Sequence, residues 1–240
     1  MTWQKWISAL LLVPVLGYVL LCLGVSLWGA GALPADRQPN RQFPSPLLRT
    51  QYLASEGIRS ADGVRLNPLT VSPYLFRERS PASNDLRLPA HAGRALVRRS
   101  AAPTGGLRWH AAELAAMIYV SRAWSVDEQI ATVLNEGYFG RDARGLTAAA
   151  NAWYGQPPEA LRPEESLALL VLTRGPSFYD PLCRPGRFNH RFRILSTRLD
   201  IADKDAALAR ARERLRPVAC GDRSVPTAAF IPLSVSSISS

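Results

Sequence analysis

The arginines of this chain are the residues whose type most directly suggests chemistry. The sequence of 240 residues carries 29 basic side chains against 19 acidic ones, and Lys5 and Lys204 are its only lysines. Arginine binds phosphate through two parallel N–H donors, whereas lysine acts as a point charge. A net charge of +10 that consists almost entirely of arginine therefore predicts attraction to phosphate groups and anionic lipid head groups.

Arg94, Arg98 and Arg99 form a local cluster of these side chains. Their spacing places them on one face if the segment is helical, and such a face would bind a diphosphate. A solvated basic surface explains the same spacing equally well. Nucleic acid would also account for the overall charge, but the sequence contains no recognisable nucleic-acid-binding motif. We therefore predict no nucleic-acid partner.

The segment from Arg108 to Pro181 has the clearest helix signals and must position much of any site. Ser125-Val126-Asp127-Glu128 is a capping box, which predicts a helix start at Val126. Glycines and prolines end the apolar periodicity of each element in turn. Four helices are predicted, over residues 113–119, 126–135, 146–154 and 163–172. Together they predict a compact α-helical lobe.

The N-terminal stretch from Trp6 to Ala35 contains no charged residue. At about 1.5 Å per residue it is long enough to cross a hydrocarbon core of about 30 Å, so we predict an uncleaved transmembrane anchor. A cleaved signal peptide, with Ala30-Gly31-Ala32 as its cleavage site, is the competing interpretation. The apolar stretch, however, is longer than the ~7–15 residues of a usual signal core.

Cys183 and Cys220 are the only cysteines outside this apolar stretch, which holds Cys22. In an oxidising compartment a disulfide between them would stabilise the fold by ~3–4 kcal/mol in the chain-entropy account. Two free thiols are the alternative. Histidine stands next to neither cysteine, so a zinc site is not expected.

Three motifs in the helical lobe resemble those of a known family in their order and spacing. They are Asn135-Glu136-Gly137-Tyr138-Phe139-Gly140, then Ala148-Ala149 with Trp153-Tyr154-Gly155, then Gly175-Pro176-Ser177-Phe178-Tyr179-Asp180-Pro181. They are similar to the LNxxYFG, AAxxYFG and APSxYxP signatures of glycosyltransferase family 51. This family comprises the peptidoglycan glycosyltransferases, both as monofunctional transglycosylases and as domains of class A penicillin-binding proteins.

The resemblance implies a mainly α fold, in which a single N-terminal transmembrane helix precedes a lysozyme-like helical glycosyltransferase domain with a small membrane-facing lobe. The expected organisation has four parts. They are an anchor over 1–35, a diverged proline-rich part over 36–106, a helical transglycosylase-like core over 107–218, and a C-terminal tail over 219–240. The catalytic domain is expected on the periplasmic side of a bacterial cytoplasmic (inner) membrane.

The resemblance also implies two catalytic carboxylates. Glu56, in Leu53-Ala54-Ser55-Glu56-Gly57-Ile58-Arg59, is similar to the glutamate at the start of the family's first motif and would be the general base. Glu113 matches the glutamate of the RKxxE motif and would lie near a diphosphate. An ordinary surface glutamate and a helix-dipole contact are the respective alternatives.

Further substrate contacts follow from the same comparison. Arg108 lies one position before the arginine of the RKxxE motif, and Asn135, Tyr138 and Gly140 would shape the cleft. The pattern also departs from the family in places. Gly57, Ser60 and Gly63 stand where the first motif has Asp, Phe and His, and the GGSTITQQ-like second motif is missing between residues 85 and 100.

Family membership implies glycan polymerisation from lipid II, in which a sugar hydroxyl displaces polyprenyl diphosphate with inversion. A divalent metal ion would assist the diphosphate, but no ligand cluster in the sequence demands one. The missing motifs leave a second hypothesis, a catalytically inactive scaffold that binds lipid-linked precursor. Expected partners are lipid II or the growing glycan strand, the membrane, and other cell-wall synthesis proteins.

Overall fold

The computed structural model describes residues 3–60, 62–69, 71, 84–100, 106–217 and 220, with side chains from residue 12 onward. Within these ranges the structure is helical, and its one β-type feature is an isolated bridge between Tyr138 and Arg144. The helices are α1 (Trp3–Ala30), α2 (Pro46–Glu56), α4 (Arg87–Arg98), α5 (Gly106–Ala123), α6 (Val126–Glu136), α7 (Leu146–Tyr154), α8 (Pro163–Leu172), α9 (Pro185–Arg198) and α10 (Lys204–Glu213), with a short 3-10 turn, η2 (Pro158–Ala160). The mainly α fold predicted from the sequence is confirmed.

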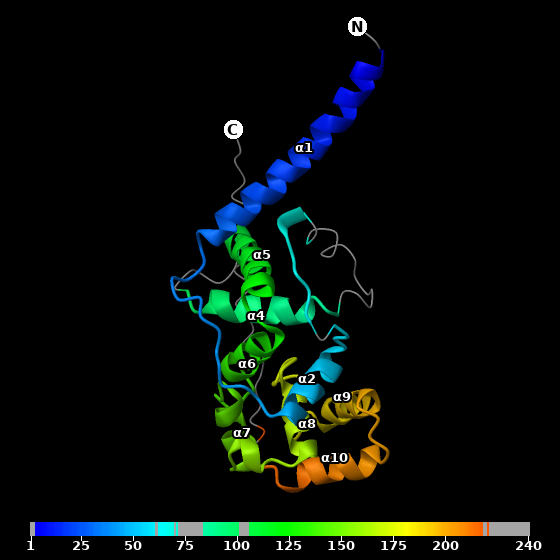
Figure 1. Cartoon of the computed structure of the whole chain (residues 1–240). Coiled ribbons are helices and arrows are strands. Elements are labelled where there is room, and N and C mark those ends of the chain that lie inside the picture. The colour runs from blue at the N-terminus through cyan, green and yellow to red at the C-terminus, as the bar shows by residue number, and fades with distance from the viewer. Residues whose placement is uncertain are drawn as a thin grey trace, which may run out of the picture.

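Helix α1 projects from one end of the molecule, and α10 lies at the opposite end (Figure 1). The segment Leu12–Ala30 of α1 has a mean hydropathy of 2.0, so it is long and apolar enough to cross a membrane. It is almost wholly exposed. The helix ends at Ala30, five residues before the predicted end at Ala35. Pro34 prevents the helix from continuing to Ala35, because a proline and the residue before it disfavour helical backbone.

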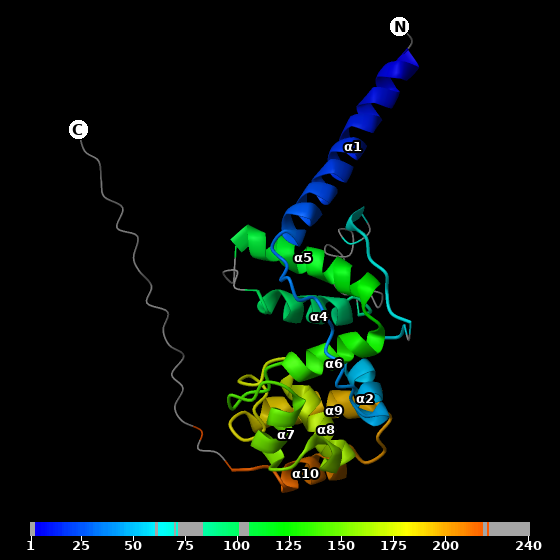
Figure 2. The ribbon, with the colours of Figure 1, turned by 60° about the vertical axis from the view of Figure 1, so that its left-hand side comes forward.

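Helices α4 and α5 form a layer between α1 and α6 (Figure 2). Ala92, Leu96 and Val97 of α4 are buried against the alanine-rich face of α5, which also carries α1. Below this layer, α2 and α6 to α10 enclose a larger apolar core. The segment 36–106 thus contributes to both parts, because Leu48 and Tyr52 of α2 fill the lower core and α4 builds the upper layer.

Local signals explain the helix boundaries that the sequence predicted. The Ser125 hydroxyl accepts from the Glu128 amide at 3.1 Å, and the Glu128 carboxylate accepts from the Ser125 amide at 2.9 Å, so the capping box of α6 is formed. Helix α7 ends at Tyr154 and is capped by Gly155, whose φ of 67° is left-handed. Helix α5 is longer than the predicted 113–119, because its apolar face continues into the contact with α1.

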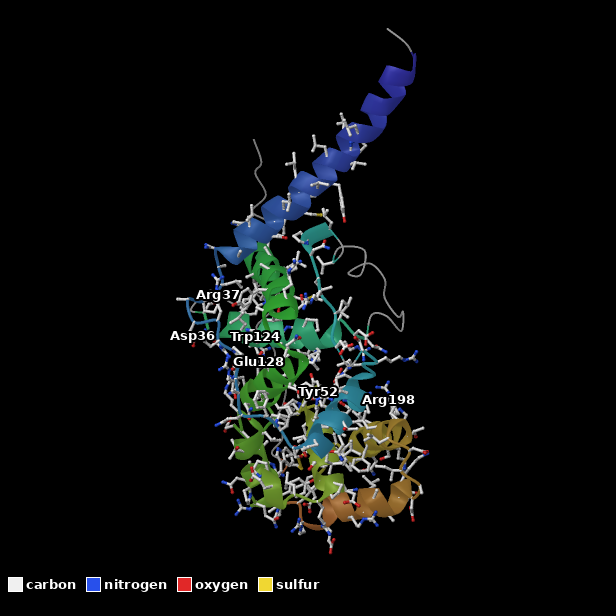
Figure 3. All side chains as sticks on the ribbon, viewed as in Figure 1. Asp36, Arg37, Tyr52, Trp124, Glu128 and Arg198 are labelled. Atoms are coloured by element: carbon white, nitrogen blue, oxygen red, sulfur yellow. A yellow bond between two sulfur atoms is a disulfide. The ribbon has the colours of Figure 1, made fainter. Side chains whose placement is uncertain are left out.

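An extended segment connects α1 with α2 along the side of the molecule. The indole of Trp124 donates to the carbonyl of Arg37 at 3.1 Å (Figure 3), and the amide of Asn40 donates to the hydroxyl of Thr132 at 2.9 Å. These contacts hold the segment on α5 and α6. Helix α1 is therefore joined to the core through a chain segment whose position is fixed by hydrogen bonds.

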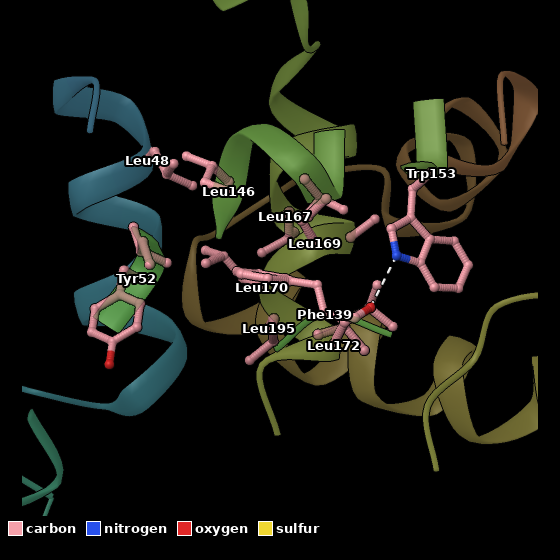
Figure 4. Close-up of a cluster of buried hydrophobic side chains, with 14 of the residues drawn as sticks. Leu48, Tyr52, Phe139, Leu146, Trp153, Leu167, Leu169, Leu170, Leu172 and Leu195 are labelled. Atoms are coloured by element: carbon pink, nitrogen blue, oxygen red, sulfur yellow. Dashed lines mark hydrogen bonds between the residues drawn. The ribbon is translucent and has the colours of Figure 1, made fainter. Parts of the chain in front are cut away.

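The lower core is centred on α8, whose apolar residues are buried around its circumference. Leu167, Leu169 and Leu170 pack between α2 and the loop that carries Phe139 (Figure 4). The indole of Trp153 donates to the carbonyl of Phe139 at 2.9 Å, which joins α7 to this loop. A disulfide joins Cys183 to Cys220, with 5.4 Å between their Cα atoms, and ties the chain after α10 to the start of α9.

Gly29 allows the close approach of α1 to α5. A Cβ atom at this position would lie 2.0 Å from the carbonyl oxygen of Ala111, a backbone atom that cannot move away alone. We expect Gly29→Ala to force the two helices apart and to lower the free energy of unfolding by about 2 kcal/mol, a typical cost of overpacking. Thermal unfolding of the full chain in detergent measures the effect.

Gly24→Ala is the matched control, because Gly24 lies on the same helix and a Cβ atom there would meet no atom of the described residues within 4 Å. Alanine there should leave stability unchanged or increase it, since alanine favours helix more than glycine does by about 1 kcal/mol. Equal effects of the two substitutions would contradict the close packing of α1 on α5.

Candidate functional site: the arginine cleft

A cavity of about 270 Å³ opens where α4, the end of α6 and the turn after α8 meet, and we call it the arginine cleft. Its polar lining includes Arg94, Arg98 and Arg174 together with His91 and Tyr138. The other residues that line it are Ala95, Val133, Glu136, Gly137, Thr173, Gly175 and Pro176. Helices distant in sequence thus bring three arginines to one opening.

Helix α4 presents His91, Arg94 and Arg98 to the cleft, because residues three and four positions apart share a helix face. Arg98 is exposed, and its side chain forms no hydrogen bond or ion pair within the part of the chain that the structure describes. The Nε atom of Arg94 donates to Glu113 Oε1 at 2.7 Å. The predicted Arg94 and Arg98 therefore do share one face and one cavity.

Glu136 is the carboxylate that lines the cleft, and Arg99 already neutralises it. The Nε atom of Arg99 donates to Glu136 Oε2 at 3.0 Å, and a second Arg99 nitrogen contacts the other oxygen. Arg94 pairs with Glu113 and Arg174 with Glu56, so among the described residues Arg98 is the arginine of the lining without a carboxylate partner. This arginine, beside two others, suits an anionic group such as a diphosphate.

Glu56 lies at the end of α2, where it is 1% exposed, and it is not among the residues that line the cleft. Arg174 holds it, because Arg174 Nε donates to Glu56 Oε1 at 3.2 Å and the Nη2 atom contacts Oε2. Arg87 Nη1 lies 3.9 Å from the same carboxylate. A buried carboxylate requires such partners, since an unpaired buried charge is costly.

These neighbours set the protonation of the cluster. Burial alone raises the pKa of Glu56, but the hydrogen bond and charge of Arg174, aided by His91 and Arg87, outweigh it and lower the pKa below its ordinary value. Burial lowers the pKa of His91, so its imidazole is neutral near pH 7. Burial, followed by the charge of Glu56, raises the pKa of Tyr52.

The backbone at the end of α2 is also surrounded by cations. Arg198 donates to the carbonyl of Ser55 at 2.6 Å, and Arg87 donates to the carbonyl of Glu56 at 3.0 Å. Figure 3 shows Arg198 beside this helix. The orphan carbonyls of a helix end are thereby satisfied, and the surroundings of Glu56 carry more positive than negative charge.

Glu113 lies on a second opening, which we call the anchor groove. This groove has a volume of about 420 Å³ and lies between α1, α4 and α5. Arg94 lines both the groove and the arginine cleft, so the two openings meet at its side chain. The other groove residues are Val25, Trp28, Ala90, Leu107, His110, Ala111, Leu114 and Met117. A polar cleft thus adjoins an apolar groove beside the apolar helix.

The remaining predicted site residues lie in different places. Tyr138 lines the cleft, and Gly140 supports it from behind, since its φ is 84° and a Cβ would lie 2.9 Å from Pro176 Cβ. The side chain of Asn135 is turned to the extended segment and donates to the carbonyl of Gln42 at 2.7 Å. Arg108 is exposed near the start of α5 and lines neither opening.

Sequence reasoning missed two residues of the cleft, His91 and Arg174. His91 had a signal, because it precedes Arg94 by three positions and so shares its helix face. Arg174 also had a signal, since it directly precedes the Gly175-Pro176 turn of a recognised motif. Among the described residues no group of three or more His, Cys, Asp or Glu side chains is placed to hold a metal ion.

Comparisons with known proteins place part of this chain in a family. The family profile described as Transglycosylase matches residues 97–200, which include Glu113, Tyr138 and Arg174 but not Glu56, His91 or Arg94. Penicillin-binding protein 1A of Mycolicibacterium smegmatis is 36% identical over 118 residues, which cover 47% of this chain and 15% of that protein.

Two further penicillin-binding proteins 1A are similar to this chain. The protein of Mycobacterium tuberculosis is 38% identical over 91 residues, or 38% of this chain and 11% of the relative. The protein of Pseudomonas aeruginosa is 33% identical over 79 residues, or 33% of this chain and 10% of the relative. The chain thus spans a small part of the length of these relatives. Residues 97–200 are thus similar to the transglycosylase family, in agreement with the resemblance of the motifs to glycosyltransferase family 51.

Proposed function

We propose that this protein is a peptidoglycan glycosyltransferase that takes lipid II as its substrate. The observation that carries the proposal is the junction of the arginine cleft with the anchor groove at Arg94. A polyprenyl-diphosphate-linked sugar needs cations for its diphosphate and an apolar surface for its lipid. The cleft supplies the first, and the groove beside α1 supplies the second.

The proposed orientation follows from the same arrangement. Helix α1 crosses the cytoplasmic membrane and leaves the helical domain at the periplasmic surface. The groove then faces the lipid phase, while the cleft receives the sugars and the diphosphate. The disulfide between Cys183 and Cys220 fits an oxidising compartment of this kind. Other cell-wall synthesis proteins are proposed partners at this surface.

The reaction requires a proton acceptor and a stabilised leaving group. The hydroxyl of the acceptor sugar transfers its proton to a carboxylate, for which we propose Glu56, and its oxygen attacks the anomeric carbon of the donor. The bond between that carbon and the diphosphate oxygen breaks with inversion. Arg94 and Arg98 stabilise the negative charge that develops on the diphosphate, and Glu113 orients Arg94 through their hydrogen bond.

One observation favours a second function, the binding of lipid-linked precursor without turnover. Glu56 is buried and paired with Arg174, and a carboxylate with a lowered pKa is a weak base near neutral pH. In that case the arginine cleft serves as a binding site and the protein as a scaffold. Both functions predict lipid II binding, so the two are separated by turnover alone.

The test combines lipid II binding with glycan polymerisation by the detergent-solubilised full chain. We expect the parent to bind and polymerise lipid II, Glu56→Gln to lose polymer by at least about a hundredfold, and Arg98→Gln to weaken binding about tenfold. Arg193→Gln is the control, because Arg193 pairs with Asp205 on α9 and α10 and lines neither opening.

Three outcomes are decisive. Binding without polymer from a well-folded parent would establish the scaffold instead of the enzyme. If Glu56→Gln still makes polymer but Glu113→Gln does not, the general base is Glu113 and not Glu56. Absence of lipid II binding by the parent, or equal weakening by Arg98→Gln and Arg193→Gln, would exclude the cleft as the substrate site.

A further inference from the structure

Arg174 stands between two sites that the proposed function uses. Its guanidinium holds both oxygens of Glu56, which is buried, yet its side chain is 31% exposed and lines the arginine cleft. One cation therefore faces a carboxylate on one side and an anion-binding cavity on the other. Arg174 contacts Glu56 through its Nε and Nη2 atoms, and an anion that enters the cleft would compete with Glu56 for the charge and the position of this guanidinium.

We propose that Arg174 is a positioning residue that exchanges between two anions, Glu56 and a diphosphate bound in the arginine cleft, and thereby couples ligand binding to release of the Glu56 carboxylate. The inference deepens the proposed function and rests on it. The proposed function needs only that the cleft binds the diphosphate. The inference adds that this binding and the Arg174–Glu56 pair exclude each other.

The neighbours of Glu56 make such an exchange feasible. When Arg174 leaves, Glu56 retains Arg87, whose Nη1 atom lies 3.9 Å from its Oε2 atom. The carboxylate is thus not left without a cation. The diphosphate in turn gains a third arginine beside Arg94 and Arg98, and it can accept from each of them.

The exchange has a chemical consequence for glycosyl transfer. Loss of the Arg174 hydrogen bonds removes the main effect that lowers the pKa of Glu56, while burial continues to raise it. The carboxylate then becomes a stronger base at the moment when the diphosphate is in place. Proton transfer from a sugar hydroxyl to Glu56 would be favoured only in the occupied cleft.

Thermodynamic linkage supplies the test. If Glu56 and the diphosphate compete for Arg174, removing the charge of Glu56 must tighten diphosphate binding. We expect Glu56→Gln to increase the affinity of the full chain for inorganic pyrophosphate about tenfold, measured by calorimetry in detergent. In an Arg174→Gln background the same substitution should change the affinity by less than about twofold.

Glu136→Gln is the matched control for charge alone. Glu136 lines the cleft, but its partner is Arg99, so removing its charge leaves the Arg174 pair intact. We expect it to increase pyrophosphate affinity by no more than about threefold through weaker general repulsion. Should Glu56→Gln fail to fold, Glu56→Asp shortens the side chain away from Arg174 and should shift the affinity in the same direction.

The result that overturns the inference differs from the one that overturns the proposed function. Pyrophosphate binding that Glu56→Gln and Glu136→Gln increase equally, or a gain that persists in the Arg174→Gln background, would disprove the exchange and leave the proposed function standing. No binding of either pyrophosphate or farnesyl diphosphate would remove the proposed function itself. If farnesyl diphosphate binds more tightly than inorganic pyrophosphate, the site is assigned to a lipid-linked diphosphate. If the two bind equally, the site is assigned to a free diphosphate.

Discussion

Arg174→Met is expected to lower the free energy of unfolding by about 3 kcal/mol, because it leaves the buried Glu56 carboxylate without its bidentate partner. This loss lies at the lower end of the usual cost of removing one partner of a buried ion pair, since Arg87 remains 3.9 Å from the Glu56 carboxylate. Chemical denaturation of the detergent-solubilised protein at pH 7 measures it. Arg193→Met removes a pair between exposed side chains and should cost less than about 1 kcal/mol.

The same variant should reverse the pH dependence that Glu56 contributes. In the parent the folded pKa of Glu56 lies below its ordinary value, so its stabilising contribution is present above that value and is lost as pH falls. Without Arg174, burial dominates and raises the folded pKa. In the variant, the contribution of Glu56 to stability is then present at low pH and is lost as pH rises. A parallel pH dependence in parent and variant would contradict the buried ion pair.

Trp153→Ala is expected to lower the free energy of unfolding by about 3–5 kcal/mol, the usual cost of removing a buried tryptophan side chain. Trp153 is 1% exposed, and its indole donates to the carbonyl of Phe139. The guanidinium of Arg141 also lies 3.7 Å from the centre of its ring. The variant therefore loses apolar packing, a hydrogen bond and a cation–π contact together.

Phe178→Ala is the control for this effect, since Phe178 is a large aromatic residue that is 50% exposed. It should cost less than about 1 kcal/mol. Because Phe139 directly precedes Gly140, which packs on Pro176 of the cleft, Trp153→Ala should also weaken pyrophosphate binding. Similar losses of stability for the two variants would show that Trp153 does not anchor this loop.

Much of the helical scaffold was predictable because its signals are local. The capping box at Ser125 and the left-handed glycine at Gly155 act within a few residues of the boundary that they set. The apolar run of α1 identifies a possible membrane span by composition alone. The motifs between Asn135 and Pro181 indicated the family, which the profile match confirms.

The region before residue 106 was predicted less well, since its prolines conceal two helices. Helix α2 starts at Pro46, where proline is tolerated in a first turn, and the Ser45 hydroxyl accepts from the Leu48 amide. Helix α4 contains Pro89 in its first turn for the same reason. The prolines therefore suggested irregular structure, although Pro46 and Pro89 in fact lie in the first turns of two helices.

The sequence by itself determined the helices between residues 106 and 172, the apolar run of α1, the family motifs and the shared face of Arg94 and Arg98. The tertiary structure alone decided which side chains meet. Arg174 and Glu56 are 118 positions apart in the sequence, and they pair because α2 packs against α8. No local periodicity records such a contact, since it depends on how buried faces fit together across the core. For that reason Glu56 could be predicted as a residue of interest, whereas its burial beneath Arg174 could not.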